Sequence, residues 1–384
     1  MARSKYSAKK KKKSVSRKVI DFFAGSEHRA YLVGGYVRDS TLGRESIDID
    51  VVVEGDGISA ARKLNAVLKG KIVSHPDFGT ASIDIDGYRV DIASARTEKY
   101  PSPAHLPHVY PSTIVEDLNR RDFTINAIAM SISRTNFGEI FDPFDGLSDI
   151  KHKLVRVLHR GSFIDDPTRI FRALRYKNRF QFKLEDETER LMREAVKAGM
   201  IMKLSGPRIL NEVALVFAEE TYAEIVSDLI HYGILTLKRR DLRLMPSTSE
   251  LAFYFLLSKL PRNMLPLTRE MKKVVDGFRK IEDTMDKLHR SGTKSKIYNA
   301  LSPVAEEVIE AMPIVNPQLS DKTKIFHNLR HVKPFITGKD LKKYGFKPEN
   351  MYSKILHSVF LLQLDKKLKS RRDALAYLKN LSKN

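Results

Sequence analysis

A ten-residue stretch, SIDIDVVVEG at positions 46–55, constrains the fold of this chain more than any other. Its apolar residues predict a β-strand, in which successive side chains point to opposite faces. Asp48 and Asp50 then share one face, and the run Val51–Val53 indicates that both faces are covered. Two like charges beside a core are costly unless a cation lies between them. The stretch therefore predicts a cation site within a sheet or, alternatively, an edge strand with one wet face.

The segments around this strand predict a mixed sheet with helices. A short apolar strand, Tyr31–Val33, leads into Gly34 and Gly35, and a short helix follows. Apolar residues at helical spacing predict another helix over residues 57–69. From about residue 150 onward the pattern is almost wholly helical. We therefore expect an α+β protein, in which a mixed sheet domain is followed by a long helical region.

Two more strands are predicted in GTASIDIDGYRVDIASA, where Asp86-Gly87 is a strong hairpin-turn signal. A second DID, formed by Asp84 and Asp86, belongs to this turn, where aspartate is favoured for local backbone hydrogen bonds. Asp91 lies on the returning strand. It would be a third carboxylate beside the first two if its strand lies next to theirs, and is otherwise one polar position in an alternating strand.

The charge balance points to a polyanionic partner. The 384 residues include 68 Lys and Arg against 47 Asp and Glu, a formal net charge of +21, which favours nucleic acid or nucleotide. A membrane surface is the alternative, but there is no apolar run of spanning length and no signal-peptide pattern. The absence of cysteine excludes disulfides, thiol nucleophiles and cysteine-based zinc sites. We expect a cytoplasmic protein with a disordered basic arm over residues 1–18, which contains the run Lys9–Lys13.

Gly34 and Gly35 stand between a strand and a helix, where the backbone can approach a ligand closely and free N–H groups can meet phosphate oxygens. A tight turn is the ordinary explanation of a lone Gly-Gly. Here, however, Arg38 follows in the helix and the paired acids follow on the next strand. This order predicts a nucleotide site with the triphosphate on the glycines and arginine, and metal ions on the acids.

Five stretches, in this order, resemble class II tRNA nucleotidyltransferases: LVGGYVRD…SIDIDVVVEG, EDLNRRDFTINAIAM, FDPFDGLSDI, DDPTRIFRALRY and SGPRILNEV. That family comprises the CCA-adding enzymes and their bacterial poly(A) polymerase relatives. The resemblance spans residues 31 to about 215, and residues 334–384 are similar to the family's tail. It implies a polymerase-β-like head at 19–150, a nucleotide-selecting neck at 151–220, a body at 221–330 and a tRNA-binding tail at 331–384.

The resemblance also implies site residues. Asp48 and Asp50 would bind metal, with Asp91 as the open third acid of the catalytic set. Carboxylate oxygens suit Mg²⁺, and two such ions roughly 4 Å apart would bridge the incoming α-phosphate and the primer 3′-hydroxyl. With the residue-based arguments added, the expected nucleotide-binding residues are Gly34, Gly35, Arg38, Arg121, Asp122, Asp166, Arg169, Arg172 and Arg175.

Two of these residues lie in RRDFTINA. Arg121 is expected on phosphate and Asp122 near the ribose hydroxyls. The alternative is that Asp122 caps a helix formed by FTINAIAM, while Arg120 and Arg121 are solvated charges.

The segment DDPTRIFRALRYKNRF begins as an ordinary helix would, with Asp166 suited to the cap and Pro167 to the first turn. At 100° per residue, Arg169, Arg172, Arg175 and Arg179 fall within an arc of about 120°. An all-arginine stripe is unusual for a merely solvated face. Asp166 can accept from the exocyclic amine of cytosine or adenine while Arg169 donates to the neighbouring ring nitrogen, and guanine and uracil present the reverse pattern.

The chain departs from the family pattern in places. Asp165 stands where the family usually has Glu, Pro207 stands where many members have Glu, and GFKPENMY lacks a Gly-rich turn. Asp142 and Asp145 of FDPFDGLSDI are expected to belong to a flexible joint rather than to the catalytic set.

We expect a CCA-adding tRNA nucleotidyltransferase that uses CTP, ATP and Mg²⁺ and acts on the acceptor end of tRNA. A relative that adds only A or only CC, and a poly(A) polymerase, remain open. The loop TEKYPSPAHLPHVYPSTIVED has the length found in enzymes that complete the terminal A. A non-catalytic RNA-binding protein is the rival from another class, but such a protein has no use for the paired acids. The oligomeric state is left open.

Overall fold

The computed structural model describes residues 15–45, 48–85, 87–261, 264–346 and 351–382. The chain divides into two compact units, Met1–Thr236 and Leu237–Asn384. The finer division into head, neck, body and tail remains a prediction.

A seven-stranded sheet with the strand order β3-β4-β5-β2-β1-β8-β9 is the centre of the first unit. Its strands are β1 (Arg29–Val33), β2 (Ile49–Glu54), β3 (Lys71–His75), β4 (Thr80–Ile85), β5 (Tyr88–Ser94), β8 (Ala129–Ser131) and β9 (Ile140–Phe141). β2 and β5 pair in parallel, and the other neighbouring strands of this sheet are antiparallel. The predicted mixed sheet is thus confirmed.

β2 is a central strand, paired with β1 on one side and β5 on the other. Ile49 and the run Val51–Val53 are at most 2% exposed, so both faces of the strand are covered, as predicted. The alternative of an edge strand with a wet face is therefore wrong.

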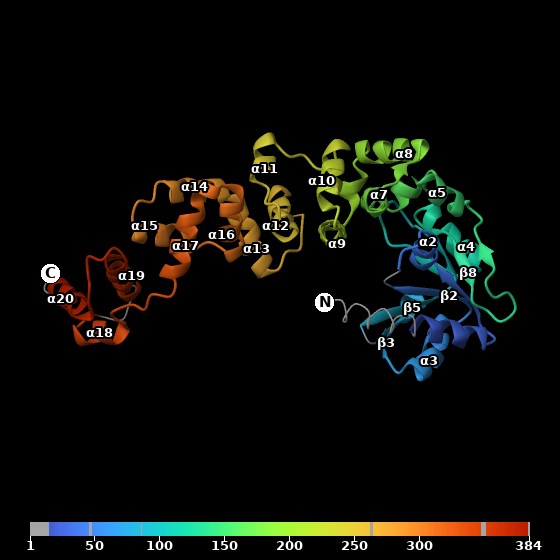
Figure 1. The fold of residues 1–384 in the computed structure, drawn as a ribbon, viewed down its shortest axis with the longest axis horizontal. Coiled ribbons are helices and arrows are strands. Elements are labelled where there is room, and N and C mark those ends of the chain that lie inside the picture. The colour runs from blue at the N-terminus through green and yellow to red at the C-terminus, as the bar shows by residue number, and fades with distance from the viewer. Residues whose placement is uncertain (1–14, 46–47, 86, 262–263, 347–350, 383–384) are drawn as a thin grey trace. The chain divides into compact units, whose positions relative to one another are not determined.

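Helices cover this sheet and continue beyond it (Figure 1). The helices of the first unit are α2 (Gly35–Thr41), α3 (Gly57–Leu68), α4 (Ile114–Asn119), α5 (Gly146–His152), α6 (Ser162–Asp165), α7 (Thr168–Phe180), α8 (Asp186–Lys197), α9 (Gly206–Phe217) and α10 (Tyr222–His231). Two small sheets pair β6 (Arg96–Lys99) with β7 (His108–Pro111), and β10 (Leu154–Val155) with β11 (Lys183–Leu184). The helices expected after Gly34-Gly35 and over residues 57–69 are present as α2 and α3.

Two expectations about local structure are wrong. FTINAIAM forms a 3₁₀ turn, Thr124–Asn126, followed by β8, because Ala129 to Ser131 pair with β1 and tertiary pairing outweighs helix propensity. The disorder predicted for residues 1–18 is wrong for residues 15–18. Residues 15–24 are helical, since Val15, Val19 and Phe23 recur at four-residue spacing and are buried. Residues 1–14 lie outside the described part of the chain.

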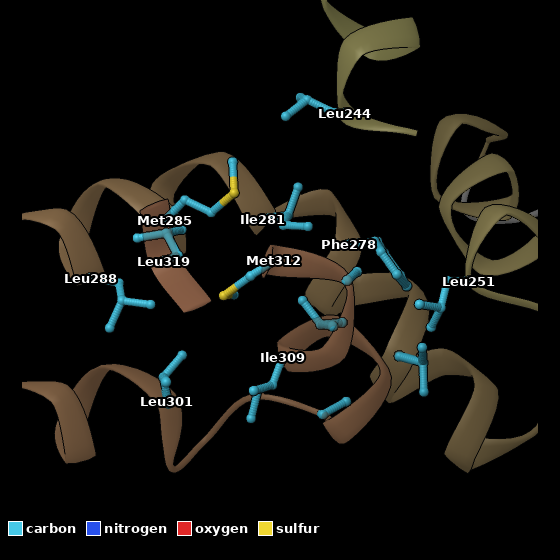
Figure 2. Packing of buried hydrophobic residues seen from close by; sticks show 14 of the residues in the cluster. Leu244, Leu251, Phe278, Ile281, Met285, Leu288, Leu301, Ile309, Met312 and Leu319 are labelled. Atoms are coloured by element: carbon cyan, nitrogen blue, oxygen red, sulfur yellow. The ribbon is translucent and has the colours of Figure 1, made fainter. Parts of the chain in front are cut away.

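In the described residues of the second unit, the regular elements are all helices. Its helices are α11 (Arg239–Leu244), α12 (Ser249–Lys259), α13 (Arg269–Arg279), α14 (Ile281–His289), α15 (Lys294–Leu301), α16 (Glu306–Val315), α17 (Ser320–Leu329), α18 (Gly338–Lys343), α19 (Met351–Leu364) and α20 (Arg371–Leu381). Figure 2 shows apolar side chains of several helices converging, among them Phe278, Met285 and Met312. Ile336, Leu341, Val359, Ala374 and Leu378 form a separate cluster near the C-terminus.

Two motifs of the sequence lie partly outside the described residues. Of GFKPENMY, residues 347–350 lie outside the described part, as does Asp86 of the hairpin turn. Within the described ranges, no helix combines the length and the apolar character needed to span a bilayer.

Candidate functional site

A cavity of about 680 Å³ in the first unit is lined by residues of both the sheet and the helices that follow it. It brings together most of the residues expected from the sequence: Gly34, Gly35, Arg38, Asp50, Asp91, Arg121, Asp122, Asp166, Arg169 and Arg172. Asp48 and Arg175 are not part of the lining.

Asp50 and Asp91 lie opposite each other on the parallel strands β2 and β5. The condition under which Asp91 would join the first acids is therefore met. Asp48 immediately precedes β2 and is exposed. Burial raises the pKa of Asp50 to about 6, and the charges of Asp91 and Asp48 add to the rise while Arg121 opposes it.

The chemistry of these carboxylates fits a divalent cation, because hard cations prefer oxygen ligands and a cation would offset the like charges around Asp50. Among the described residues, however, no group of three or more His, Cys, Asp or Glu is placed to hold a metal ion. Asp91 is engaged elsewhere: its Oδ1 accepts from the Ser82 hydroxyl and from Nε of Arg89 at 3.0 Å. Asp91 would have to share these bonds to serve as a third ligand.

The Gly34-Gly35 turn and Arg38 form one wall of the cavity. Gly34 has φ 58°, and a Cβ atom there would lie 2.7 Å from Nη1 of Arg121. Glycine is therefore favoured here for two reasons: the positive φ of the turn, and the close approach of the Arg121 side chain. Arg38 is only 4% exposed, donates to Asn126 Oδ1, and lies 4.6 Å from the centre of the Phe180 ring.

Arg120 and Arg121 are held by one buried acid rather than by solvent. Asp117 Oδ1 accepts from Arg120 at 2.8 Å, and Asp117 Oδ2 accepts from Arg121 at 3.0 Å. Both arginine side chains are less than 20% exposed. The alternative in which they are solvated charges is wrong.

Asp122 is buried and is not the cap of a regular helix. Its Oδ2 accepts from Arg172 Nε at 2.6 Å, and its Oδ1 accepts from Asn126 Nδ2 at 2.8 Å and from the Phe123 backbone N–H at 2.9 Å. Burial raises the pKa of Asp122, but Arg172 and Asn126 outweigh it and leave that pKa below its ordinary value. Asp122 thus fixes Arg172 at the cavity; its predicted contact with ribose stays a prediction.

Asp166 and Arg169 both line the cavity, yet they are held by different partners. Asp166 Oδ1 accepts from the Thr168 N–H at 3.0 Å and from Arg208 at 2.6 Å, so the residue caps α7 as well. Arg169 donates to Ser162 Oγ at 2.7 Å and to the Arg120 carbonyl at 2.9 Å. In the described part of the chain, the hydrogen bonds that the Asp166 carboxylate accepts end on Oδ1.

The arginine stripe of α7 divides into two functional halves. Arg169 and Arg172 line the cavity, as predicted. Arg175 and Arg179 instead donate to Glu219, at 3.0 Å from Arg175 Nε and 2.8 Å from Arg179 Nε. Arg175 therefore lies outside the cavity lining and joins α7 to the segment that follows α9. Its predicted part in nucleotide binding stays a prediction.

Several residues of the site were not singled out from the sequence. Glu98, Tyr100, Asn126 and Tyr176 line the cavity, and Arg208 binds Asp166 from α9. Arg208 lies in SGPRILNEV, so the motif was a signal for it. The others are single polar or aromatic positions whose importance depends on contacts between distant segments.

Asp142 and Asp145 stand at the start of α5. Asp142 accepts from the backbone N–H groups of Gly146 at 2.7 Å and Leu147 at 2.9 Å, and Asp145 has φ 56°. Neither lines the cavity, in keeping with the expectation that they are not catalytic. Their hinge role remains a prediction.

Comparison with known proteins identifies the class. Residues 30–156 match the poly A polymerase head domain. The A-adding tRNA nucleotidyltransferases of Geobacter sulfurreducens and Halalkalibacterium halodurans are 34% and 28% identical to this chain, over 89% and 94% of its length. The chain spans 44% of the Geobacter protein and 90% of the Halalkalibacterium protein. It spans only 25% of a third relative, from Aquifex aeolicus, at 44% identity.

Solved structures agree over nearly the whole chain. A CCA-adding enzyme in an apo form is 29% identical with a TM-score of 0.78, and the match covers 96% of each chain. The CCA-adding enzyme of Thermotoga maritima, in complex with tRNA, is 27% identical with a TM-score of 0.71, covering 95% and 94%. The fold of residues 30–156 is thus that of a poly A polymerase head domain. Over nearly its whole length the chain is similar to class II CCA-adding enzymes, a family whose members generally use a divalent metal ion.

Asp50→Asn should stabilise the metal-free protein near neutral pH. The pKa of Asp50 rises from 3.8 to about 6 on folding, so stability is lost as the pH rises from about 4 through 6 and the buried carboxyl gives up its proton. Two pKa units correspond to about 3 kcal/mol, and partial screening leaves roughly 1–2 kcal/mol. Thermal unfolding with a chelator, at about pH 4.5 and 7.5, measures the gain. Asp84→Asn, an exposed site, is the control, and equal effects of Asp50→Asn at both pH values would contradict the prediction.

Proposed function

We propose that this protein adds nucleotides to the 3′ end of tRNA without a nucleic-acid template, uses CTP and ATP, and completes the CCA end. One observation carries the proposal: the aspartate pair Asp50 and Asp91, on adjacent strands, and a fixed Asp–Arg set line the same cavity. Solved CCA-adding enzymes in complex with CTP and with ATP support it, with TM-scores of 0.78 and 0.75 at 27% identity and with 94% of each of those chains covered. A cytoplasmic location remains a prediction.

Asp48 and Asp50 are the residues that would hold Mg²⁺, with Asp91 as the candidate third ligand. The bound ions would ease deprotonation of the RNA 3′-hydroxyl and stabilise the leaving pyrophosphate. The hydroxyl oxygen forms a bond to the α-phosphorus as the bond to pyrophosphate breaks. Arg38 and Arg121 supply fixed positive charge for the triphosphate from the wall of the cavity.

Asp166 and Arg169 would select the base. Oδ2 of Asp166 accepts from the exocyclic amine of cytosine or adenine, and Arg169 donates to the neighbouring ring nitrogen. Guanine and uracil would leave these buried groups unpaired, which can support discrimination on the order of 10⁴. Because Arg208, Ser162 and the Arg120 carbonyl already hold the two side chains, little ordering is needed when the nucleotide binds.

Addition of the terminal A alone is the second candidate. Three relatives at 28–44% identity are A-adding tRNA nucleotidyltransferases, and one of them is matched over 90% of its length. The cavity geometry is common to both candidates, so the products must separate them.

Purified protein should be given tRNAs that end before CCA, after C and after CC, with CTP and ATP supplied separately and together. A CCA-adding enzyme extends all three to a complete end. Extension of only the CC-ended tRNA, by ATP, would establish the A-adding alternative instead. Asp50→Ala should lower incorporation more than tenfold while tRNA still binds. Binding without incorporation by the wild-type protein would indicate an RNA-binding protein and refute the enzyme.

Asp166→Asn should change base selection and not only stability. Asparagine caps a helix about as well as aspartate, so a residue that serves only as a cap would be little affected. As a reader of the base, Asn can donate where Asp accepts, which opens the site to uracil. Single and competitive incorporation of all four nucleotides, with thermal unfolding alongside, measures both effects. A stable variant with unchanged preference for CTP and ATP would reduce Asp166 to a cap.

The second unit carries a basic cavity suited to RNA phosphates. It has a volume of about 490 Å³ and is lined by Lys273 of α13, Lys287 of α14 and Lys280 between the two helices. The one acid in the lining, Asp276, is neutralised by Arg279 at 2.8 Å.

Binding of tRNA should therefore fall steeply with salt, and these lysines should carry part of the effect. Each phosphate contact contributes about 0.7–0.9 to the slope of log affinity against log salt. Replacing the three lysines of this cavity by Gln should lower the slope by up to about 3 in filter-binding assays. The control removes three exposed lysines of the first unit, Lys63, Lys183 and Lys197. Equal slopes for the two triple variants would leave the cavity without a role in RNA binding.

A further inference from the structure

Glu98, near the end of β6, is the centre of a buried network beside the cavity. Its side chain is 8% exposed. Oε1 accepts from Arg96 Nη2 at 3.2 Å and from Arg120 Nη1 at 2.8 Å, while Oε2 accepts from the Tyr100 hydroxyl at 3.1 Å. Glu98, Tyr100 and Arg120 all line the cavity.

Arg120 connects this network to the base-selecting side. Its guanidinium is shared between Glu98 and Asp117, and its backbone carbonyl accepts from Arg169 Nη2 at 2.9 Å. In the described part of the chain, the Arg169 guanidinium makes one other hydrogen bond, to Ser162 Oγ. One of its two hydrogen bonds is thus accepted by the carbonyl of Arg120, the residue whose side chain Glu98 and Asp117 hold in place.

Glu98 also balances the positive charge of the neighbouring arginines. Arg96, Arg120 and Arg121 lie within a region that contains two acids, Glu98 and Asp117. Burial and the nearby charge of Arg120 lower the pKa of Arg96. Removing the charge of Glu98 would leave three crowded guanidinium groups with one carboxylate, so Arg120 would move toward Asp117 or toward the cavity.

Tyr100 belongs to the same network and lines the cavity. Burial, with the charge of Glu98, raises the pKa of Tyr100 to about 12, so its hydroxyl is protonated near neutral pH and donates to Glu98. Tyr100 lies close enough to Arg169 and Asp166 for their charges to act on it. Its phenol is therefore part of the surface that a base would meet.

We infer that Glu98 is a positioning residue for nucleotide selection, which acts through Arg120 to orient Arg169 and through Tyr100 to shape the base-binding surface. The inference rests on the proposed function, in which Arg169 reads the base edge. In the alternative, Glu98 only neutralises buried arginines and sustains the fold. The two differ in what Glu98→Gln does to selectivity.

The experiment compares Glu98→Gln with Arg169→Ala as benchmark and Glu116→Gln, at an exposed site of α4, as control. With full-length protein and tRNA, kcat and KM are measured for CTP, ATP, UTP and GTP singly, together with the thermal unfolding temperature. We expect Glu98→Gln to lower the ratio of kcat/KM for CTP over UTP about tenfold, mainly by raising the KM for CTP. Glu116→Gln should leave the ratio unchanged.

The selectivities of the two variants together decide whether Glu98 is a positioning residue. Loss of selectivity in both Arg169→Ala and Glu98→Gln supports the inference. Loss in Arg169→Ala alone, even with a lower rate or stability in Glu98→Gln, overturns it and makes Glu98 a structural residue. If neither variant changes selectivity, the base-reading role of Arg169 fails, and this inference fails with it. Should Glu98→Gln not fold, Tyr100→Phe removes only the hydroxyl, and an unchanged CTP preference there overturns the inference.

Discussion

The site depends on two carboxylates that the central sheet forces together. Because β2 and β5 are adjacent and parallel, Asp50 and Asp91 are opposite each other, and Asp50 is largely buried. Neither residue can move away without loss of strand pairing. The negative charge of the two carboxylates is offset by arginines that line the same cavity. A cation bound there would offset this charge further.

The arginines around these carboxylates are themselves held in place, since nearly every arginine at the cavity is bonded to a partner. Asp117 holds Arg120 and Arg121, Asp122 holds Arg172, and Ser162 with a backbone carbonyl holds Arg169. Charges already in place cost no reorganisation at the moment of reaction. Asp91 and Asp166, which also line the cavity, accept from arginines as well, from Arg89 and Arg208 respectively.

The sequence predicted the parts that local periodicity and ordered motifs determine. The alternation in SIDIDVVVEG indicated a covered strand, and Asp50 lies where it was expected, although pairing with β5 begins at Ile49 and leaves Asp48 exposed before the strand. Helical spacing predicted α3 and the buried side of α7. The partner of Arg175 could not be predicted, because Glu219 is 44 residues away and the helical wheel of α7 contains no information about it.

The loop between β6 and β7 also makes contacts with distant residues that the sequence does not predict. From the sequence only its length could be considered. In the fold, Ala104, at φ 64°, donates its N–H to the Asp165 carbonyl at 3.2 Å and accepts from Arg208 at 2.6 Å. The second guanidinium nitrogen of Arg208 binds Asp166. One arginine therefore ties the loop to Asp166, the acid proposed to read the base, and through this contact, which the length of the loop does not predict, the loop would act on nucleotide choice.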